Sequence, residues 1–214
     1  MSTPTVETVE MYTDPLCPWA WLSSRWLYEA ERVRDFTVVT KVFSLAEVNK
    51  DKPEIAKHLD SMRRGGRILM AARRAGGEAA MRAVYAEIGE ANHERDESLA
   101  DEATLRAAVS AAGLDASLVE TALSDDSIQA AVVAEHNAAV ERGAFGVPTL
   151  SIDGSPAYFG PIVDRRITGE EAGQLWDVVR PLLLHPYVFE LKRSRGDPEI
   201  GRTRIRQMAS AAAG

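Results

Sequence analysis

The chain has 214 residues, of which 45% are hydrophobic and 27% are charged, as in a globular protein with one core or with one domain that carries an insertion. Its net charge of -7 argues against a nucleic-acid-binding protein, because such proteins usually present a basic face. The chain start lacks a signal-peptide pattern and no apolar run approaches the roughly 18 residues that span a bilayer, so we expect a cytoplasmic protein without membrane contacts.

The first predicted elements are a strand over residues 6–12, a turn at Asp14-Pro15, and an amphipathic helix that begins near Pro18. Proline suits the first helical position, because the amide that it lacks would have no intrahelical partner there. Cys17, the only cysteine, therefore lies at a helix entrance, where unpaired amides and the helix dipole favour the reactive thiolate. A lone cysteine is more often a small buried hydrophobe, but strand, Cys-Pro and helix together favour a nucleophile. One cysteine forms no internal disulfide, which fits a reducing compartment.

Residues 36–43 are rich in β-branched and aromatic side chains and predict a second strand, parallel to the first in a right-handed βαβ unit. Ala, Arg and Glu then dominate residues 53–142, where apolar residues recur at helical intervals. We expect several helices in this block, with breaks near Gly76-Gly77, Ala91-Asn92-His93, Gly113 and Ser124-Asp125.

Strand character returns at residues 146–152, and Asp153-Gly154 predicts a hairpin to a short strand over residues 157–159. Thr168 and Glu171 have the spacing of a capping box, which predicts a helix that Pro181 kinks or ends. We expect the residues after about Arg193 to be partly disordered or to cover a neighbouring subunit.

The order βαβ, helical block, ββα predicts an α/β, thioredoxin-like fold that is interrupted by an all-helical insertion domain. Residues 1–52 and 143–192 would form the discontinuous thioredoxin-like domain, residues 53–142 the helical insertion, and residues 193–214 a C-terminal tail.

Two motifs carry a resemblance to known proteins: Cys17-Pro18-Trp19 at the start of the first predicted helix, and Gly146-Val147-Pro148-Thr149 before the third predicted strand. With these motifs the chain resembles the DsbA-like branch of the thioredoxin superfamily, and more closely the actinobacterial mycothiol-dependent nitroreductase family. The stretches similar to that family are Asp14-Pro15-Leu16-Cys17-Pro18-Trp19, Ser24-Arg25-Trp26, Phe159-Gly160-Pro161, Gly169-Glu170-Glu171-Ala172-Gly173 with Leu175-Trp176-Asp177, and Phe189-Glu190-Leu191-Lys192-Arg193. The helical block matches least well, and its clearest similarity is near Asn92-His93.

The resemblance implies an oxidoreductase in which Pro148 is a cis proline that faces Cys17. The exposed backbone of Val147 would then pair with a substrate as an added strand would. The resemblance also implies mycothiol as a co-substrate, with nitroaromatic or quinone-like compounds or protein disulfides as substrates.

Ala20 occupies the position at which dithiol relatives carry a second cysteine. A dithiol site resolves its mixed disulfide internally, because the second thiol attacks the first sulfur. Here an external thiol, mycothiol or glutathione, must clear any adduct on Cys17, which predicts a monothiol active site. Two origins stay open for Ala20: a natural residue, or one introduced to trap a mixed disulfide.

Cys17 is the expected catalytic residue, and substrate or thiol contacts are expected from Pro18, Trp19, Ala20, Val147, Pro148, His93, Arg67 and Tyr158. Trp19 would stack on an aromatic substrate, and Tyr158 would form another wall of the groove unless it packs in the core. Arg67, with Arg63 and Arg64, would hold an anionic part of the thiol. His93 is either a polar group that reaches the cleft or a surface histidine in a turn.

The cysteine and four scattered histidines show no metal-ligand spacing, and no glycine-rich nucleotide loop follows a strand. We therefore expect no metal and no tightly bound cofactor. The partners would be a low-molecular-weight thiol and a small aromatic electrophile or disulfide, and the Ala-rich helices also allow a homodimer.

Two alternative functions stay open. One is an isomerase or transferase like the kappa-class glutathione transferases, in which the helix entrance activates a bound thiol cofactor without redox turnover. The other is a redox-inactive binding protein that keeps the groove.

Overall fold

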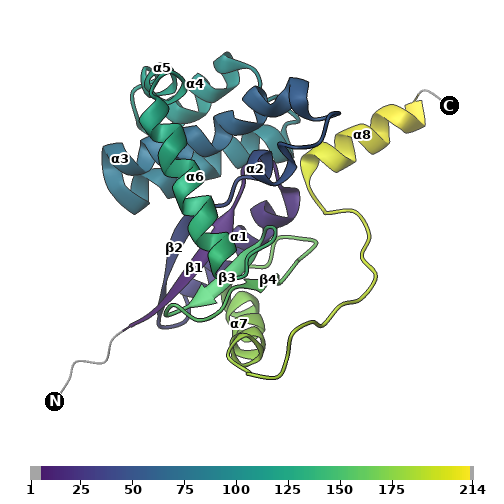
Figure 1. Cartoon of the computed structure of the whole chain (residues 1–214). Coiled ribbons are helices and arrows are strands. Elements are labelled where there is room, and N and C mark those ends of the chain that lie inside the picture. Colours follow the sequence, from purple (N-terminus) through teal and green to yellow (C-terminus); the bar gives the residue numbers. More distant parts are fainter. Residues whose placement is uncertain (1–5, 213–214) are drawn as a thin grey trace.

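The computed structural model describes residues 6–212, in which one sheet has the strand order β2-β1-β3-β4 (Figure 1). Strands β1 (Glu7–Thr13) and β2 (Phe36–Val42) are parallel, with Val9 opposite Val38. Strand β3 (Thr149–Ile152) runs antiparallel to β1, and β4 (Tyr158–Phe159) runs antiparallel to β3. Helix α1 (Pro18–Glu31) connects these two parallel strands, which confirms the predicted βαβ unit and the thioredoxin-like fold.

Helices α1 (Pro18–Glu31) and α7 (Gly169–Leu183) pack against each other beside this sheet. Trp26 of α1 is fully buried and donates its indole N–H to the carbonyl of Ala172, 3.1 Å away. Trp176 of α7 stacks on Phe36 of β2 with 4.5 Å between ring centroids. Large aromatic surfaces removed from water thus join α1 and β2, near the start of the chain, to α7, near its end.

The inserted helices lie at the opposite end of the molecule from α7 (Figure 1). They are the short η1 (Ala56–His58), α3 (Leu59–Gly89), η2 (Glu90–Glu94), α4 (Glu102–Ala111), α5 (Leu118–Ser124) and α6 (Asp126–Glu141), and the short α2 (Leu45–Asn49) precedes them. The predicted break at Gly76-Gly77 is a kink inside α3, where Gly77 has φ +71°. The predicted break near residues 91–93 is confirmed, because α3 ends at Gly89, the π-helical turn η2 ends at Glu94, and the next helix, α4, begins only at Glu102.

Three predictions about local structure have different outcomes. The hairpin at Asp153-Gly154 is confirmed, with φ values of +46° and +80° at the two turn residues. Thr168 does occupy the N-cap of α7, but its side chain makes no capping hydrogen bond, so the predicted capping box is wrong. Pro181 lies inside α7, which ends two residues later at Leu183.

The expectation of a partly disordered C-terminus is wrong for residues 201–212, which form helix α8 (Gly201–Ala212) and pack against η2. The segment between α7 and α8 follows one side of the molecule (Figure 1). We call residues 184–200 together with α8 the strap. Within residues 6–212, no helix has the combination of length and apolar character that crossing a membrane requires.

Candidate functional site

Cys17 is the N-cap of α1, with extended backbone angles of φ −87° and ψ 112°. Its Sγ accepts a hydrogen bond from the amide of Ala20 at 3.4 Å, so the sulfur occupies the position of a capping side chain. The amide of Cys17 donates to the carbonyl of Asp14 at 3.0 Å, which holds the turn between β1 and α1. Only 8% of Cys17 is exposed, so neighbouring residues shield most of this side chain from solvent.

Opposing effects act on the thiol. Burial raises the pKa of Cys17 above its usual value, the amides of Ala20 and Trp19 lower it, the Asp14 charge raises it, and Arg195 lowers it. The helix entrance therefore acts in the predicted direction, but burial outweighs it in the protein without a partner. A thiolate forms here only with help from the surrounding charges and amides.

Asp14 is a buried carboxyl group next to the thiol, with 3% exposure. Its two oxygens accept hydrogen bonds from the amides of Leu16 at 2.9 Å and Leu45 at 2.8 Å. Burial raises the pKa of Asp14 to about 6, against the effect of these two amides. Asp14 thus ties the turn over residues 14–17 to the start of α2, and it titrates close to neutral pH. We call residues 14–17 the nucleophile turn, after the role predicted for Cys17.

Exchanging Asp14 for Asn should reveal this titration in the stability of the fold. The pKa of Asp14 is about 6 in the folded protein and 3.8 ordinarily, so the folded state favours the protonated carboxyl. The stability that this preference contributes is lost as the pH rises from 3.8 to about 6. The free energy of unfolding of the wild type, relative to Asp14→Asn, should fall by about 3 kcal/mol across this pH range. Denaturant unfolding at several pH values measures the difference. A constant gap between the two proteins would contradict the raised pKa.

The loop before β3 forms the other side of the site. The Val147–Pro148 peptide bond is cis, as the resemblance implies, and so is the Gly160–Pro161 bond. The Cys17 thiol donates to the carbonyl of Val147 at 3.5 Å, which brings the predicted pair of motifs together. Val147 is 6% exposed and belongs, with Cys17 and Ala20, to a small hydrophobic cluster separate from the main core.

His93 lies beneath the nucleophile turn and is fully buried. Its Nε2 is 2.9 Å from the carbonyl of Pro15, which also accepts from the side-chain amide of Asn92 at 3.3 Å. A carbonyl only accepts, so Nε2 carries the proton. Burial, and then the charge of Arg202, lowers the pKa of His93 to about 3. A neutral His93 therefore supports the backbone that precedes Cys17.

Trp19 lies two residues after Cys17, in the first turn of α1, and is half-buried. It packs against the small cluster that contains Cys17 and Val147. The guanidinium of Arg195, from the strap, lies 4.7 Å from the centroid of its ring. Pro18 is the first residue of α1 and Ala20 is fully buried, so both shape the helix entrance.

Two predicted contact residues serve other contacts in the structure. Arg67 donates from Nε to the carbonyl of Ala122 at 2.6 Å and from Nη2 to that of Asp125 at 3.2 Å, at the end of α5. The Tyr158 hydroxyl donates to the carbonyl of Val188 at 2.6 Å. Arg67 therefore holds the helical insertion together, and Tyr158 fastens the start of the strap.

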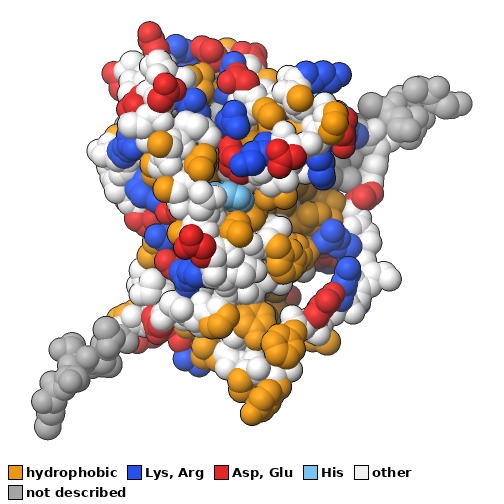
Figure 2. Space-filling model, viewed as in Figure 1, with side chains coloured by type: hydrophobic (Ala, Val, Ile, Leu, Met, Phe, Trp, Pro, Cys, Tyr) orange, Lys and Arg blue, Asp and Glu red, His pale blue; other side chains and the backbone are white. Residues whose placement is uncertain are grey.

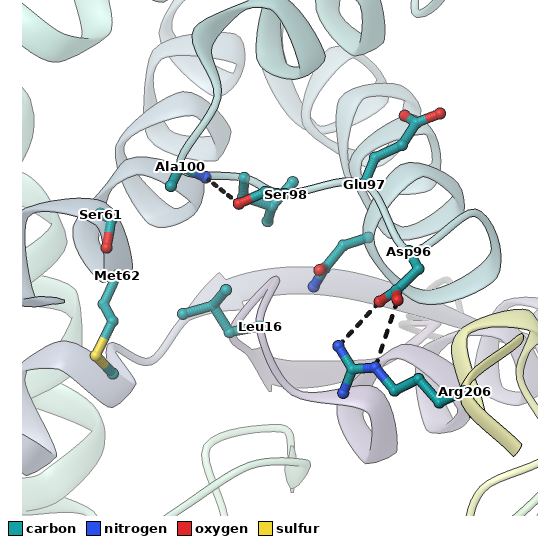
Figure 3. Close-up of a pocket in the computed structure, with 10 residues that line it drawn as sticks. Leu16, Ser61, Met62, Asp96, Glu97, Ser98, Ala100 and Arg206 are labelled. Carbon is teal, nitrogen blue, oxygen red and sulfur yellow. Dashed lines mark hydrogen bonds and ion pairs between the residues drawn. The ribbon is translucent and has the colours of Figure 1, made fainter. Parts of the chain in front are cut away.

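A pocket of about 280 Å³ adjoins the nucleophile turn at Leu16 (Figure 3). Asn92 and the loop that follows η2 line it, with Asp96 on one side. Arg206 of α8 pairs with Asp96 at 3.0 Å and closes this side (Figure 3). The strap thus contributes to the surroundings of the site in addition to the predicted motifs.

The sequence prediction missed Arg195 and Arg202. Arg202 donates to the side-chain oxygen of Asn92 at 3.4 Å and lies close enough to Cys17 for their charges to interact. The only sequence signal was a run of arginines near the C-terminus, and nothing in it shows where such a tail folds back. Among the described residues, no group of His, Cys, Asp and Glu has the arrangement of a metal site.

Comparisons with known proteins agree with this geometry. The family model of the Rv2466c-like proteins, described as mycothiol-dependent nitroreductase Rv2466c, matches residues 16–193. An uncharacterized Mycobacterium tuberculosis protein, Rv2286c, is 31% identical over 199 residues, which cover 90% of this chain and 84% of that protein.

Two solved structures share the fold. A probable DsbA oxidoreductase from Streptomyces coelicolor has a TM-score of 0.58 and 19% identity, covering 89% of this chain and 94% of that one. A 2-hydroxychromene-2-carboxylate isomerase has a TM-score of 0.57 and 21% identity, covering 95% of this chain and 98% of that one.

Proposed function

Because the chain belongs to the Rv2466c-like family of mycothiol-dependent nitroreductases and is therefore an oxidoreductase, we propose that it works through a single nucleophile, Cys17, and an external low-molecular-weight thiol. One observation carries the proposal. The sulfur of Cys17 caps α1 and contacts the loop of cis-Pro148, while the alanine at position 20 supplies no second thiol.

The proposed cycle has two exchanges. The Cys17 thiolate attacks one sulfur of a disulfide, the S–S bond breaks, and the leaving thiolate takes up a proton. A second, external thiol then attacks the mixed disulfide, which restores Cys17 and releases a new disulfide. The released disulfide joins one substrate thiol to one external thiol. A second turn, in which Cys17 attacks this disulfide, releases the substrate thiol and is again cleared by an external thiol, completes the reduction. Over both turns two external thiols supply two electrons and two protons for each disulfide reduced.

The external thiol is mycothiol in this proposal, on the strength of family membership. Nitroaromatic or quinone-like compounds are the proposed acceptors besides disulfides. Trp19, half-buried beside the sulfur, offers an aromatic face for such a compound. His93 contributes indirectly, because its hydrogen bond to Pro15 holds the nucleophile turn.

Intact-mass measurement tests the nucleophile. Incubation with oxidised mycothiol or oxidised glutathione should add one thiol to the protein, and a reductant should remove it. Cys17→Ser should form no adduct and lose all thiol-dependent reduction of nitroaromatic compounds, because Cys17 is the only thiol in the chain.

The same pair of proteins separates the alternatives. An isomerase that only activates a bound thiol would keep its activity in Cys17→Ser and would depend on added reduced thiol. A redox-inactive binding protein would turn over nothing with either protein. Absence of the adduct on the wild type would contradict the proposed function.

A further inference from the structure

The strap leaves α7 at one end of the molecule and returns as α8 against the inserted helices at the other end (Figure 1). Most of it lies beyond the family match, which ends at residue 193. Its path brings residues from the far C-terminus back to the nucleophile turn, where the family match begins. The strap is therefore a candidate for properties that family membership does not assign.

Specific contacts hold the strap at both ends. Tyr158 binds the carbonyl of Val188 at 2.6 Å, and the amide of Glu199 donates to the carbonyl of Asp164 at 2.6 Å. Ile200 is fully buried, and the amide of Gly201 donates to the carboxylate of Glu94 at 2.7 Å. A side chain at Gly201 would collide with the backbone of Glu94, so this close approach requires glycine.

Between these anchors the strap presents two arginines to the thiol site. Arg195 lies over the ring of Trp19 at 4.7 Å, and Trp19 directly follows the first residue of α1. Arg202 directly follows Gly201, whose amide binds Glu94, and it donates a hydrogen bond to the side-chain oxygen of Asn92 at 3.4 Å. Figure 2 shows basic side chains of the strap beside a hydrophobic surface formed by the rest of the protein. The two guanidinium groups thus lie against side chains that adjoin the residues around the sulfur, since Trp19 is two residues from Cys17 and Asn92 binds the carbonyl of Pro15.

The groups that face Cys17 differ in charge from one element to the next. Asp14, in the turn after β1, is anionic when ionised and opposes a thiolate. His93 of η2 is neutral, and the loop before β3 contributes the carbonyl of Val147. The N-terminus of α1 contributes the amides of Ala20 and Trp19. The positive charges that act on the sulfur, Arg195 and Arg202, both come from the strap.

We propose that Arg195 and Arg202 form the cationic side of the thiol site, where they stabilise the Cys17 anion and favour acceptors that carry a negative charge. Both act as positioning residues for the reaction at sulfur. The inference rests on the proposed function, because it takes Cys17 to be the nucleophile. It adds a substrate preference and assigns a role to the part of the chain beyond the family match.

Two chromogenic disulfides test the proposal: dithiobis(nitrobenzoate), which is dianionic, and dipyridyl disulfide, which is neutral. In each case the Cys17 thiolate attacks a disulfide sulfur and the S–S bond breaks. The leaving group is measured by its absorbance, as the nitrothiobenzoate anion from the first probe and, after uptake of a proton, as pyridinethione from the second. Comparing the two probes separates an effect on the thiolate from an effect on anion binding. Rates are measured against pH for the wild type, Arg195→Gln, Arg202→Gln and the double variant.

In the double variant the midpoint of the rate profile should rise by about one pH unit, because an opposite charge nearby shifts a pKa by about that much. Near neutral pH the neutral probe should then react about threefold more slowly, since a more basic thiolate is also more nucleophilic. The dianionic probe should react about tenfold more slowly, as it also loses attraction to the arginines. A higher salt concentration should reduce the difference in rate between the wild type and the double variant for both probes.

Arg32→Gln is the matched control, because it removes the same charge from an exposed residue at the far end of α1, about 20 Å along the helix. It should leave both rates unchanged. A variant with lysine at both positions 195 and 202 should have a rate–pH profile close to that of the wild type, because it keeps both positive charges. Arg195 is exposed, so Arg195→Gln alone should fold even if the double variant does not.

An unchanged midpoint together with an unchanged ratio of the two probe rates would overturn the proposal. This failure is distinct from failure of the proposed function. If the wild type forms the mycothiol adduct while the arginine variants behave like it, the arginine assignment alone is wrong. If the profiles shift but no low-molecular-weight thiol adds to Cys17, the arginine assignment holds and the proposed function is wrong.

Discussion

Replacing Ala20 by cysteine is expected to convert a site that keeps its mixed disulfide into one that releases it. The Ala20 amide lies 3.4 Å from Cys17 Sγ, one helical turn along α1, so a thiol at this position would stand beside the mixed disulfide. It would attack Cys17 Sγ, form an intramolecular disulfide and release the bound thiol. Because the attack is intramolecular, the adduct should disappear at least about a hundredfold faster than in the wild type.

The measurement is a time course of intact mass after oxidised glutathione is removed and with no reductant added. Ala20→Ser is the control, since it adds an atom of similar size at the same fully buried position but no thiol, and its adduct should persist. Equal adduct lifetimes in Ala20→Cys and the wild type would mean that the alanine does not determine the monothiol behaviour.

Gly89→Ala is expected to cost about 3 kcal/mol or more of the free energy of unfolding. Gly89 ends α3, and a Cβ there would overlap the ring carbons of Trp21 far inside van der Waals contact. The ring has nowhere to move. It donates to Glu94 at 3.4 Å, packs edge-on against Tyr85 at 5.8 Å, and stacks on His93 at 6.0 Å.

Denaturant unfolding of Gly89→Ala measures this cost. Gly196→Ala is the matched control, because a Cβ at Gly196 meets no atom within 4 Å and its change in stability should be within about 0.5 kcal/mol. A Gly89→Ala protein as stable as the wild type would show that Trp21 is not confined. Since His93 touches both Trp21 and Pro15, the same packing also holds the nucleophile turn.

The central part of the site follows from local sequence signals. The Asp14-Pro15 turn, the Cys17-Pro18 helix entrance and the Asp153-Gly154 hairpin each depend on neighbouring residues, and the structure confirms these elements. The pairing of Cys17 with the Pro148 loop was implied by family resemblance, which carries long-range information that a single sequence does not.

The rest of the site depends on contacts between distant residues. Nothing near His93 in the sequence shows that its ring turns inward to Pro15, and nothing near Arg67 shows that it binds the carbonyls at the end of α5. Tyr158 was predicted as a wall of the groove, and its hydroxyl instead fastens the strap. Arg195 lies over Trp19 in a strap that is held by distant contacts, among them the one between Gly201 and Glu94.

The order of the strands also shapes how the chain is made on the ribosome. Strand β1 is synthesised near the start and pairs with β2 soon afterwards, but its other neighbour, β3, follows only after the whole helical insertion. At ordinary rates of translation, that edge of β1 waits on the order of ten seconds for Thr149 to Ile152. An unpaired edge invites pairing with other chains. A chaperone would therefore contribute most while β1 still has an unpaired edge, because it would prevent this edge from pairing with other chains.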